Sequence, residues 1–265
     1  MIVRLSVGKT IQRRTSKGFT LVELAVVMAI VGLLLGGIMA TLNTVAERRG
    51  WEDTQRRLDY ARDLLFSFAI VNSRLPCPAS GLTGDEAFAT GSAATGGGSC
   101  TAPYGGYLPA KAIGFQPISP SGAALDGWGN PIRYAVSATP WGLPTADGRF
   151  TRKHVATDTK VAWSVSTTPA DLVICSAATA SATSCDGGIS VVNANTVVAI
   201  VFSTGKNGAT GGTGTNESRN LDSNALFVSR TPDSSGATGG EFDDLLAWIP
   251  VGQLYGRLIA AGVLP

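Results

Sequence analysis

Residues 19–42 read FTLVELAVVMAIVGLLLGGIMATL and contain a single charged residue, Glu23. As an α-helix, this run would rise about 36 Å at about 1.5 Å per residue. That length exceeds the roughly 30 Å hydrocarbon core of a bilayer, so the run is long enough to span a membrane. It is also longer than the apolar segment of a secretory signal peptide, which holds about 7–15 residues. The sequence therefore predicts a transmembrane helix at residues 19–42.

The segment before this run is basic. Residues 1–18 carry no acidic residue and have cationic side chains at Arg4, Lys9, Arg13, Arg14 and Lys17. Because basic flanks stay on the cytoplasmic side of a membrane, we expect a cytoplasmic N-terminus and a translocated remainder. The whole chain has 21 Lys and Arg against 19 Asp and Glu, a net charge of +2. This charge argues against a nucleic-acid partner bound by bulk electrostatics.

The junction of the two segments carries a specific pattern. The heptapeptide KGFTLVE at residues 17–23 resembles the processing site of type IV pilins and type II secretion pseudopilins. In that family a prepilin peptidase cuts after the glycine and methylates the new N-terminal residue. The resemblance implies a leader peptide at residues 1–18, cleavage between Gly18 and Phe19, and an N-methylated Phe19 at the start of the mature chain.

Glu23 stands at the offset from this cut where the family has its glutamate. A carboxylate in an apolar span costs roughly 2.5–3.5 kcal/mol at the helix centre and less near an end. From composition alone, Glu23 could be an interfacial carboxylate. In a filament, the Phe19 amine of an incoming subunit could instead neutralise the Glu23 of a neighbour. Because a mismatched buried charge is costly, Glu23 would then set the axial register of packed helices, and Gly32, Gly36 and Gly37 would permit their close approach.

The helical pattern continues through residues 43–72. Pro76 and Pro78 bring any helix to an end by about Asn72. Apolar residues recur at helical spacing and form one stripe, at Leu58, Ala61, Leu65 and Phe68. The sequence therefore predicts one long helix, with a membrane or filament-core segment at residues 19–42 and an amphipathic stalk at residues 43–72.

Residues 73–265 have a different character, because Gly, Pro, Ser and Thr clusters separate short apolar runs. They predict a β-rich globular head, so the fold class is α+β, with the long N-terminal helix packed on a pilin-like sheet. A turn at Asn193-Ala194-Asn195 could join two strands as a hairpin. A final helix at Val251–Ala261 would turn Leu254, Leu258 and Ala261 inward. The expected strands are Ile132–Ser137, Val161–Val165, Leu172–Cys175, Ile189–Val192, Thr196–Phe202 and Ala225–Val228.

The head carries a second, shorter resemblance. Residues 126–134, DGWGNPIRY, resemble the D-x-W-G-N-P-x-x-Y segment of the major pseudopilin of type II secretion, which implies that Trp128 covers a turn before a strand. Residues 202–208, FSTGKNG, resemble a loop of that relative whose region binds calcium, although Lys206-Asn207 replaces Ala-Asp.

Acidic residues gather late in the chain, at Glu217, Asp222, Asp233, Glu241, Asp243 and Asp244. Calcium takes six to eight oxygen ligands, often from loop carboxylates and carbonyls. The candidate calcium ligands are Asp222, Asp233 and Asp243, and the alternative is a solvated acidic loop.

The four cysteines, Cys77, Cys100, Cys175 and Cys185, indicate disulfides in an oxidising compartment. Of the three possible connectivities, the sequence favours Cys77–Cys100 and Cys175–Cys185, because each closes a local loop rich in Gly, Ser and Thr. A zinc site is the alternative, but no C-x-x-C motif supports it.

Catalytic chemistry has little support in the sequence. The single histidine, His154, lies in the basic stretch Arg152-Lys153-His154, and there is no G-x-S-x-G motif. We therefore expect no enzyme and no certain cofactor.

Together these features predict a pseudopilin or minor pilin, a structural subunit of a type II secretion or type IV pilus filament. Its expected partners are prepilin peptidase, other pilin or pseudopilin subunits and the inner-membrane assembly platform. It would be a single-pass bacterial inner-membrane protein with a periplasmic head, and later part of a periplasmic or extracellular filament. The alternatives are a filament-tip module that binds a surface, a substrate or DNA, and a membrane-anchored enzyme.

Overall fold

In the computed structural model, the described residues are 18–89, 97–142, 145–152, 170–178, 181, 183–185, 190–193, 195–212, 214–233 and 240–264, with backbone only for 35–44, 141–142 and 145–147. The chain divides into two compact units, residues 1–47 and 48–265. The helices are α1 (Leu21–Asn72), α2 (Ala110–Ile113), α3 (Thr215–Asn220) and α4 (Val251–Ala260), with a 3₁₀ turn at Gly208–Thr210. The strands are β1 (Gly106–Tyr107), β2 (Arg133–Val136), β3 (Pro140–Gly142), β4 (Thr145–Gly148), β5 (Val173–Cys175), β6 (Val197–Ser203), β7 (Leu226–Val228) and β8 (Leu245–Pro250).

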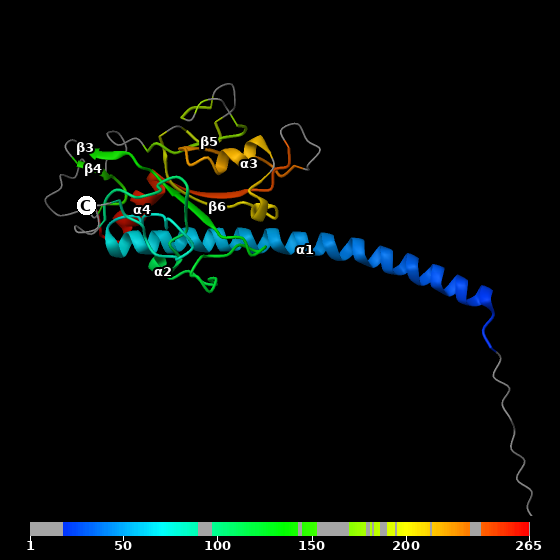
Figure 1. Cartoon of the computed structure of the whole chain (residues 1–265). Coiled ribbons are helices and arrows are strands. Elements are labelled where there is room, and N and C mark those ends of the chain that lie inside the picture. The colour runs from blue at the N-terminus through cyan, green and yellow to red at the C-terminus, as the bar shows by residue number, and fades with distance from the viewer. Residues whose placement is uncertain are drawn as a thin grey trace, which may run out of the picture. The chain divides into compact units, whose positions relative to one another are not determined.

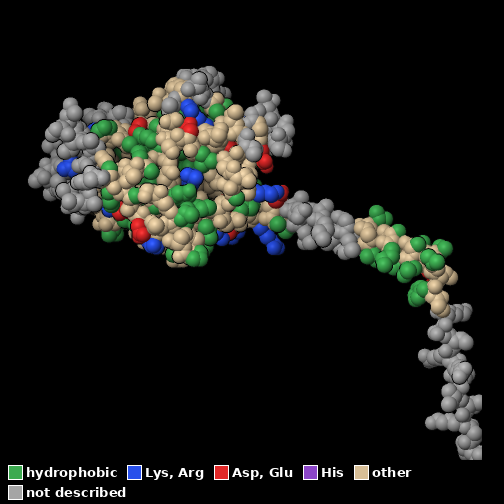
Figure 2. Space-filling model, viewed as in Figure 1, with side chains coloured by type: hydrophobic (Ala, Val, Ile, Leu, Met, Phe, Trp, Pro, Cys, Tyr) green, Lys and Arg blue, Asp and Glu red, His purple; other side chains and the backbone are tan. Residues whose placement is uncertain are grey.

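The first unit contains the beginning of α1. Its side chains from Leu21 to Leu34 are exposed on every side of the helix, and Figure 2 shows the hydrophobic ones in green around the first turns of α1. Within the part of the chain that the structure describes, no helix combines the length and the apolar character needed to cross a membrane. The transmembrane segment at residues 19–42 therefore stays a prediction.

The second unit is built on a four-stranded antiparallel sheet in the order β1-β2-β6-β8. The central strand β6 is buried along its whole length, and its side chains alternate between two hydrophobic clusters. One cluster joins β6 to α1 and α4 and includes Leu58, Leu65 and Leu254. The other joins β6 to the short parallel pair β5 and β7 and includes Ile174 and Phe227. The sheet thus lies between a helical layer and a small second sheet (Figure 1).

The chain is therefore α+β with a long N-terminal helix. α1 ends at Asn72 as the two prolines predict, and its predicted stripe faces the core, with Leu58, Ala61 and Leu65 fully buried. In α4, Leu254 and Leu258 are buried, but Ala261 follows the last helical residue and is exposed.

Four of the six predicted strands are present at β2, β5, β6 and β7. The predicted strand Val161–Val165 lies outside the described residues. The predicted hairpin around Asn193 is wrong, because the backbone N–H of Val191 donates to the carbonyl of Ile174 and Ser190 bridges to Cys175. The segment at residues 190–192 therefore pairs with β5 rather than with β6.

Candidate functional site

The N-terminal end of α1 is closed by a reciprocal set of hydrogen bonds. Thr20 is the residue before the first helical position, and its Oγ1 accepts from the backbone N–H of Glu23 at 3.2 Å. Glu23 Oε2 in turn accepts from the Thr20 N–H at 3.2 Å and from the Thr20 hydroxyl at 3.1 Å. This pattern is a capping box, which satisfies N–H groups that have no partner within the helix.

The capping box places the candidate processing site directly before an ordered helix start. Gly18 and Phe19 precede α1, and Phe19 is 82% exposed. The sequence did not single out Thr20 as a capping residue, although the T-x-x-E spacing at residues 20–23 is the signal for one. The role of Glu23 as a counter-charge between subunits stays a prediction.

The loop at residues 125–130 fastens α1 to the head. Arg57 Nη1 donates to the carbonyls of Leu125 and Asp126, each at 2.8 Å. The backbone N–H of Gly127 donates to Thr54 Oγ1, also at 2.8 Å. These contacts span less than two turns of α1, so they fix one short stretch of the helix to one loop.

Gly50 allows the closest approach between this loop and the helix. A Cβ atom at Gly50 would lie 2.4 Å from Nε1 of Trp128, a distance that no methyl group tolerates without movement. The Trp128 ring also meets the Trp51 ring edge-on, with centroids 5.8 Å apart. The structure shows that Trp128 contacts α1, and its predicted role of covering the turn in its own loop stays a prediction.

Asp126 organises the loop from inside. Its Oδ1 accepts from the backbone N–H groups of Trp128 and Asn130, and its Oδ2 accepts from the Ser203 hydroxyl at 2.6 Å. Burial raises the pKa of Asp126, while these hydrogen bonds oppose the rise. Asn130 Nδ2 donates to the carbonyl of Gly205 at 2.7 Å. The DGWGNP motif thus connects α1 with β6 and the loop that follows it.

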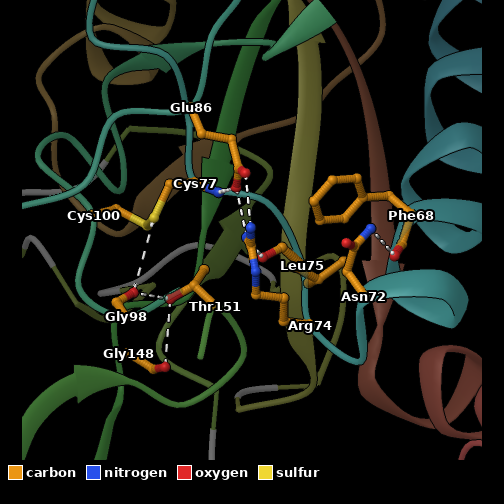
Figure 3. A network of polar contacts seen from close by, with 10 residues as sticks. All are labelled: Phe68, Asn72, Arg74, Leu75, Cys77, Glu86, Gly98, Cys100, Gly148 and Thr151. Atoms are coloured by element: carbon orange, nitrogen blue, oxygen red, sulfur yellow. Dashed lines mark hydrogen bonds and ion pairs between the residues drawn. A yellow bond between two sulfur atoms is a disulfide. The ribbon is translucent and has the colours of Figure 1, made fainter. Parts of the chain in front are cut away.

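A second fastening lies just beyond the end of α1 (Figure 3). Arg74 and Glu86 form a bidentate ion pair at 2.6 and 2.8 Å, and their side chains are only 10% and 13% exposed. Glu86 Oε1 also accepts from the backbone N–H of Cys77 at 2.8 Å. The guanidinium carbon of Arg74 lies 5.1 Å from the centroid of the Phe68 ring and 5.3 Å from that of the Phe88 ring. Arg74 therefore connects the last turns of α1 to the loop that follows Cys77.

The structure contains two disulfides, Cys77–Cys100 and Cys175–Cys185, which are the pairs that the local-loop argument favours. The first closes the loop that carries Glu86, and beside it the Thr151 hydroxyl donates to the carbonyl of Gly98 at 2.6 Å (Figure 3).

Three buried carboxylates meet between α3 and the start of β8. Glu217 of α3 and Asp243 and Asp244, just before β8, each offer an oxygen within 4.8 Å of the others. Glu217 Oε1 accepts from the Asp243 N–H at 3.0 Å and from Asn207 Nδ2 at 3.1 Å. Asp244 Oδ2 accepts from Asn220 Nδ2 at 2.7 Å. We refer to Glu217, Asp243 and Asp244 as the acidic cluster.

Burial and mutual repulsion disfavour the ionised forms of the carboxylates in the acidic cluster. Burial raises the pKa of Asp243 to about 6 and that of Asp244 to about 8, and the charge of Glu217 adds to both shifts. Asp243 Oδ1 and Asn207 Oδ1 are buried without a hydrogen-bond partner. A hard cation such as calcium prefers such oxygens, so the donor set fits it.

Only one of the predicted calcium ligands, Asp243, lies in the acidic cluster. Asp222 instead pairs with Arg219 at 2.7 Å, and Asp233 pairs with Arg230 at 2.9 Å. Each of these acids lies three residues from its partner in the sequence, so its ion pair forms between near neighbours along the chain. Glu217 and Asp244 were among the late acids but were not chosen, because their approach depends on the packing of α3 against the residues just before β8.

His154 and Lys153 of the basic stretch lie outside the described residues. The described cationic residue next to them, Arg152, is partly buried. The structure therefore does not test a role for His154.

Comparison with known proteins gives one finding. Residues 13–39 match the family model described as the prokaryotic N-terminal methylation motif. This match contains Gly18, Phe19 and Glu23, and it confirms the resemblance identified at residues 17–23. No curated protein and no solved structure matches the chain.

Proposed function

We propose that this chain, which carries the prepilin-type N-terminal signal of type IV pilins and pseudopilins, is a structural subunit of a filament of that kind. The observation that carries the proposal is the methylation motif at residues 13–39, which brackets the Gly18–Phe19 bond. α1 supports it, because the helix begins two residues after Phe19 and its first turns expose apolar side chains in all directions. Such a helix suits lipid or a bundle of like helices better than water.

The proposed sequence of events starts with prepilin peptidase. The peptidase hydrolyses the Gly18–Phe19 peptide bond, which removes residues 1–18 and leaves a free amine on Phe19. The same enzyme then methylates that amine. Residues 19–42 hold the mature subunit in the inner membrane, with the head on the periplasmic side. The assembly platform moves the subunit into a filament, where the amine of one subunit lies near Glu23 of another.

Within this class we favour a minor pilin or pseudopilin, because the head at residues 73–265 is large for a subunit that repeats along a shaft. A tip subunit with a binding role is the alternative. The two differ in the use of Glu23, since a subunit at the tip receives no later amine.

The decisive experiment reads the N-terminus of the membrane-extracted protein. We expect a mature chain that starts at N-methyl-Phe19 by terminal sequencing and intact mass. Gly18→Leu should leave the leader attached, because a side chain occupies the position next to the scissile bond, whereas Ser16→Leu should be processed normally. A mature terminus downstream of Leu42 in the unmodified protein would contradict the proposal.

We also propose that the acidic cluster binds calcium. The partnerless buried oxygens of Asp243 and Asn207 favour this over a solvated loop. A bound cation would hold the three carboxylates in their ionised form and so link α3 to the start of β8.

Thermal unfolding of the detergent-solubilised full chain tests this site. Calcium at about 100 times its dissociation constant should stabilise the fold by about 2.7 kcal/mol, which raises Tm by several degrees. Asp243→Asn should abolish this rise, whereas Asp222→Asn should retain it, because Asp222 lies in a separate ion pair. An unmodified chain whose Tm is the same in calcium and in chelator would rule the site out.

A further inference from the structure

β8 lies at the edge of the main sheet. The sheet order is β1-β2-β6-β8, and among the described residues β8 pairs with β6 alone. Its sequence, LLAWIP, carries no charge. An edge strand presents a row of backbone N–H and C=O groups that can pair with another strand.

The usual protections of an edge are missing from the middle of β8. Natural edge strands carry charged side chains, a proline or a bulge that prevents further pairing. In β8 the proline is the last residue, Pro250, and the register shift lies at the same end, between Val197 and Ala199 of β6. The stretch Leu246–Trp248 has neither, so it remains able to accept another strand.

A groove of about 310 Å³ runs beside this edge. β8 forms one wall with residues that include Leu246 and Trp248, and α1 forms the other with Gln55, Asp59 and Arg62. Both walls belong to the second unit. The groove therefore offers space along a strand edge that has no second partner among the described residues.

The charges around the groove favour a neutral peptide. Arg62 Nη2 pairs with Asp59 Oδ1 at 3.2 Å, so the α1 wall carries no net charge. Gln55 and Gln253 expose amide groups at the groove, which can both donate to and accept from a peptide backbone.

We propose that the edge of β8 and this groove form a docking site for an extended, uncharged peptide segment of a neighbouring subunit, which joins the sheet as a fifth strand. The identity of the neighbour as a subunit rests on the proposed function. Backbone hydrogen bonds to β8 supply the affinity. Alternate side chains of the added strand would face the α1 wall and the half-buried Trp248, which supplies the selectivity.

Photo-crosslinking of the full chain in its native cells tests the proposal. A benzoylphenylalanine is placed at Gln55 or Gln253, which are exposed on two sides of the groove, and at Asp63 as an exposed control on α1 outside it. We expect the two groove positions to give an adduct at least about tenfold more abundant than the control. Peptide mapping should place the link in an extended segment of another subunit.

The isolated adduct also reports on strand addition. Backbone amides of Leu246–Trp248 that point away from β6 should exchange with deuterium at least about tenfold more slowly in the adduct than in the free chain. Unchanged exchange rates, a link to a partner helix, or crosslinking at the control level would each overturn the proposal.

The N-terminus of the same sample separates this inference from the proposed function. A terminus at Phe19 without groove adducts rejects the docking site and leaves the subunit role intact. Groove adducts with strand protection on a chain that is not cut at Gly18 support the docking site and reject the subunit role.

Discussion

The first turns of α1 and its later turns differ in how far their side chains are exposed. From Leu21 to Leu34 every side chain is exposed, and apolar residues cover the whole circumference. Farther along the same helix, Leu58, Ala61 and Leu65 have no exposed surface because the head covers them. The later turns thus have their contacts within the head, whereas the first turns expose apolar side chains of the kind that the proposed filament bundle would cover.

The polar groups of the two regions differ in the same way. Thr54 and Arg57 in the later turns are engaged by the loop at residues 125–130. At the beginning of the helix, Thr20 and Glu23 satisfy each other within a single turn. Because the N–H groups of Thr20 and Glu23 are paired within the same turn, this helix start can pass from water to an apolar surrounding without leaving them unpaired. The comparison predicts that substitutions in the first region affect assembly and those in the second affect folding.

Glu23 gives the largest expected effect. In Glu23→Ala the incoming Phe19 amine would enter an apolar bundle without a counter-charge, and an unpaired buried charge is costly. We expect normal processing at Gly18, a normal amount of protein in the membrane and loss from the sheared filament fraction or loss of secretion. Quantitative blotting of both fractions, with Glu23→Gln alongside, measures this. If both variants join filaments as well as the unmodified chain, the register role is wrong, although a tip subunit would also tolerate the change.

Arg74 gives the largest expected effect on the stability of the head. Arg74→Met leaves the Glu86 carboxylate buried without its partner, which should cost about 3–5 kcal/mol in the free energy of unfolding. Arg74→Met with Glu86→Gln should recover most of the loss, because no buried charge remains and the amide oxygen can still accept from the Cys77 N–H. Urea unfolding of the solubilised full chain measures both.

Lys111→Met is the matched control for this ion pair. Its pair with Asp85 is exposed, with side-chain exposures of 45% and 65%, so its loss should cost no more than about 1 kcal/mol. Equal losses for Arg74→Met and Lys111→Met would contradict the importance of burial.

The acidic cluster makes head stability depend on pH in calcium-free buffer. The pKa of Asp244 is raised to about 8, whereas an Asp in the unfolded chain titrates near 3.9. Between these values the folded state binds a proton that the unfolded state does not, so stability should fall as the pH rises from about 4 to about 8. Asp244→Asn should flatten this slope in urea midpoints measured across the range. A midpoint that rises with pH over this interval would contradict the burial of the acid.

Two glycines in α1 allow the same substitution to be compared in the two regions. A Cβ atom at Gly50 would meet Trp128, so Gly50→Ala should destabilise the fold by about 1–3 kcal/mol. At Gly32 nothing lies within 4 Å, so Gly32→Ala should favour the helix by about 1 kcal/mol in the unassembled subunit. Thermal unfolding by circular dichroism measures both, and effects of the same sign would remove the distinction between the regions.

Thr20→Val gives the smallest expected effect. It removes the hydroxyl that accepts from Glu23 N–H, and the loss of such a cap costs about 0.5–2 kcal/mol in helix stability. Fraying should be confined to the first turn of α1 and should appear as faster amide exchange near Glu23 in the solubilised subunit. An unchanged exchange rate would show that the capping box adds nothing to the helix start.

Local patterns in the sequence predicted the features that depend on neighbouring residues. The prolines after Asn72 ended α1, and each cysteine pair closed its own loop. β8 was missed, although Leu245, Ala247 and Ile249 alternate inward, because its outward positions are also apolar and Pro250 follows directly. The acidic cluster could not be predicted, because Glu217 meets Asp243 only after α3 and the approach to β8 have packed together.

The loop at residues 125–130 has a mechanical consequence. Tension along α1 would reach the head through this loop, first where Gly50 and Trp51 contact Trp128 and then at the hydrogen bonds of Thr54 and Arg57. From there the Asp126–Ser203 hydrogen bond passes the force to the end of β6, the strand held between β2 and β8. The pull enters the sheet through a strand with a neighbour on each side, so the head can bear traction on its helix without peeling from an edge.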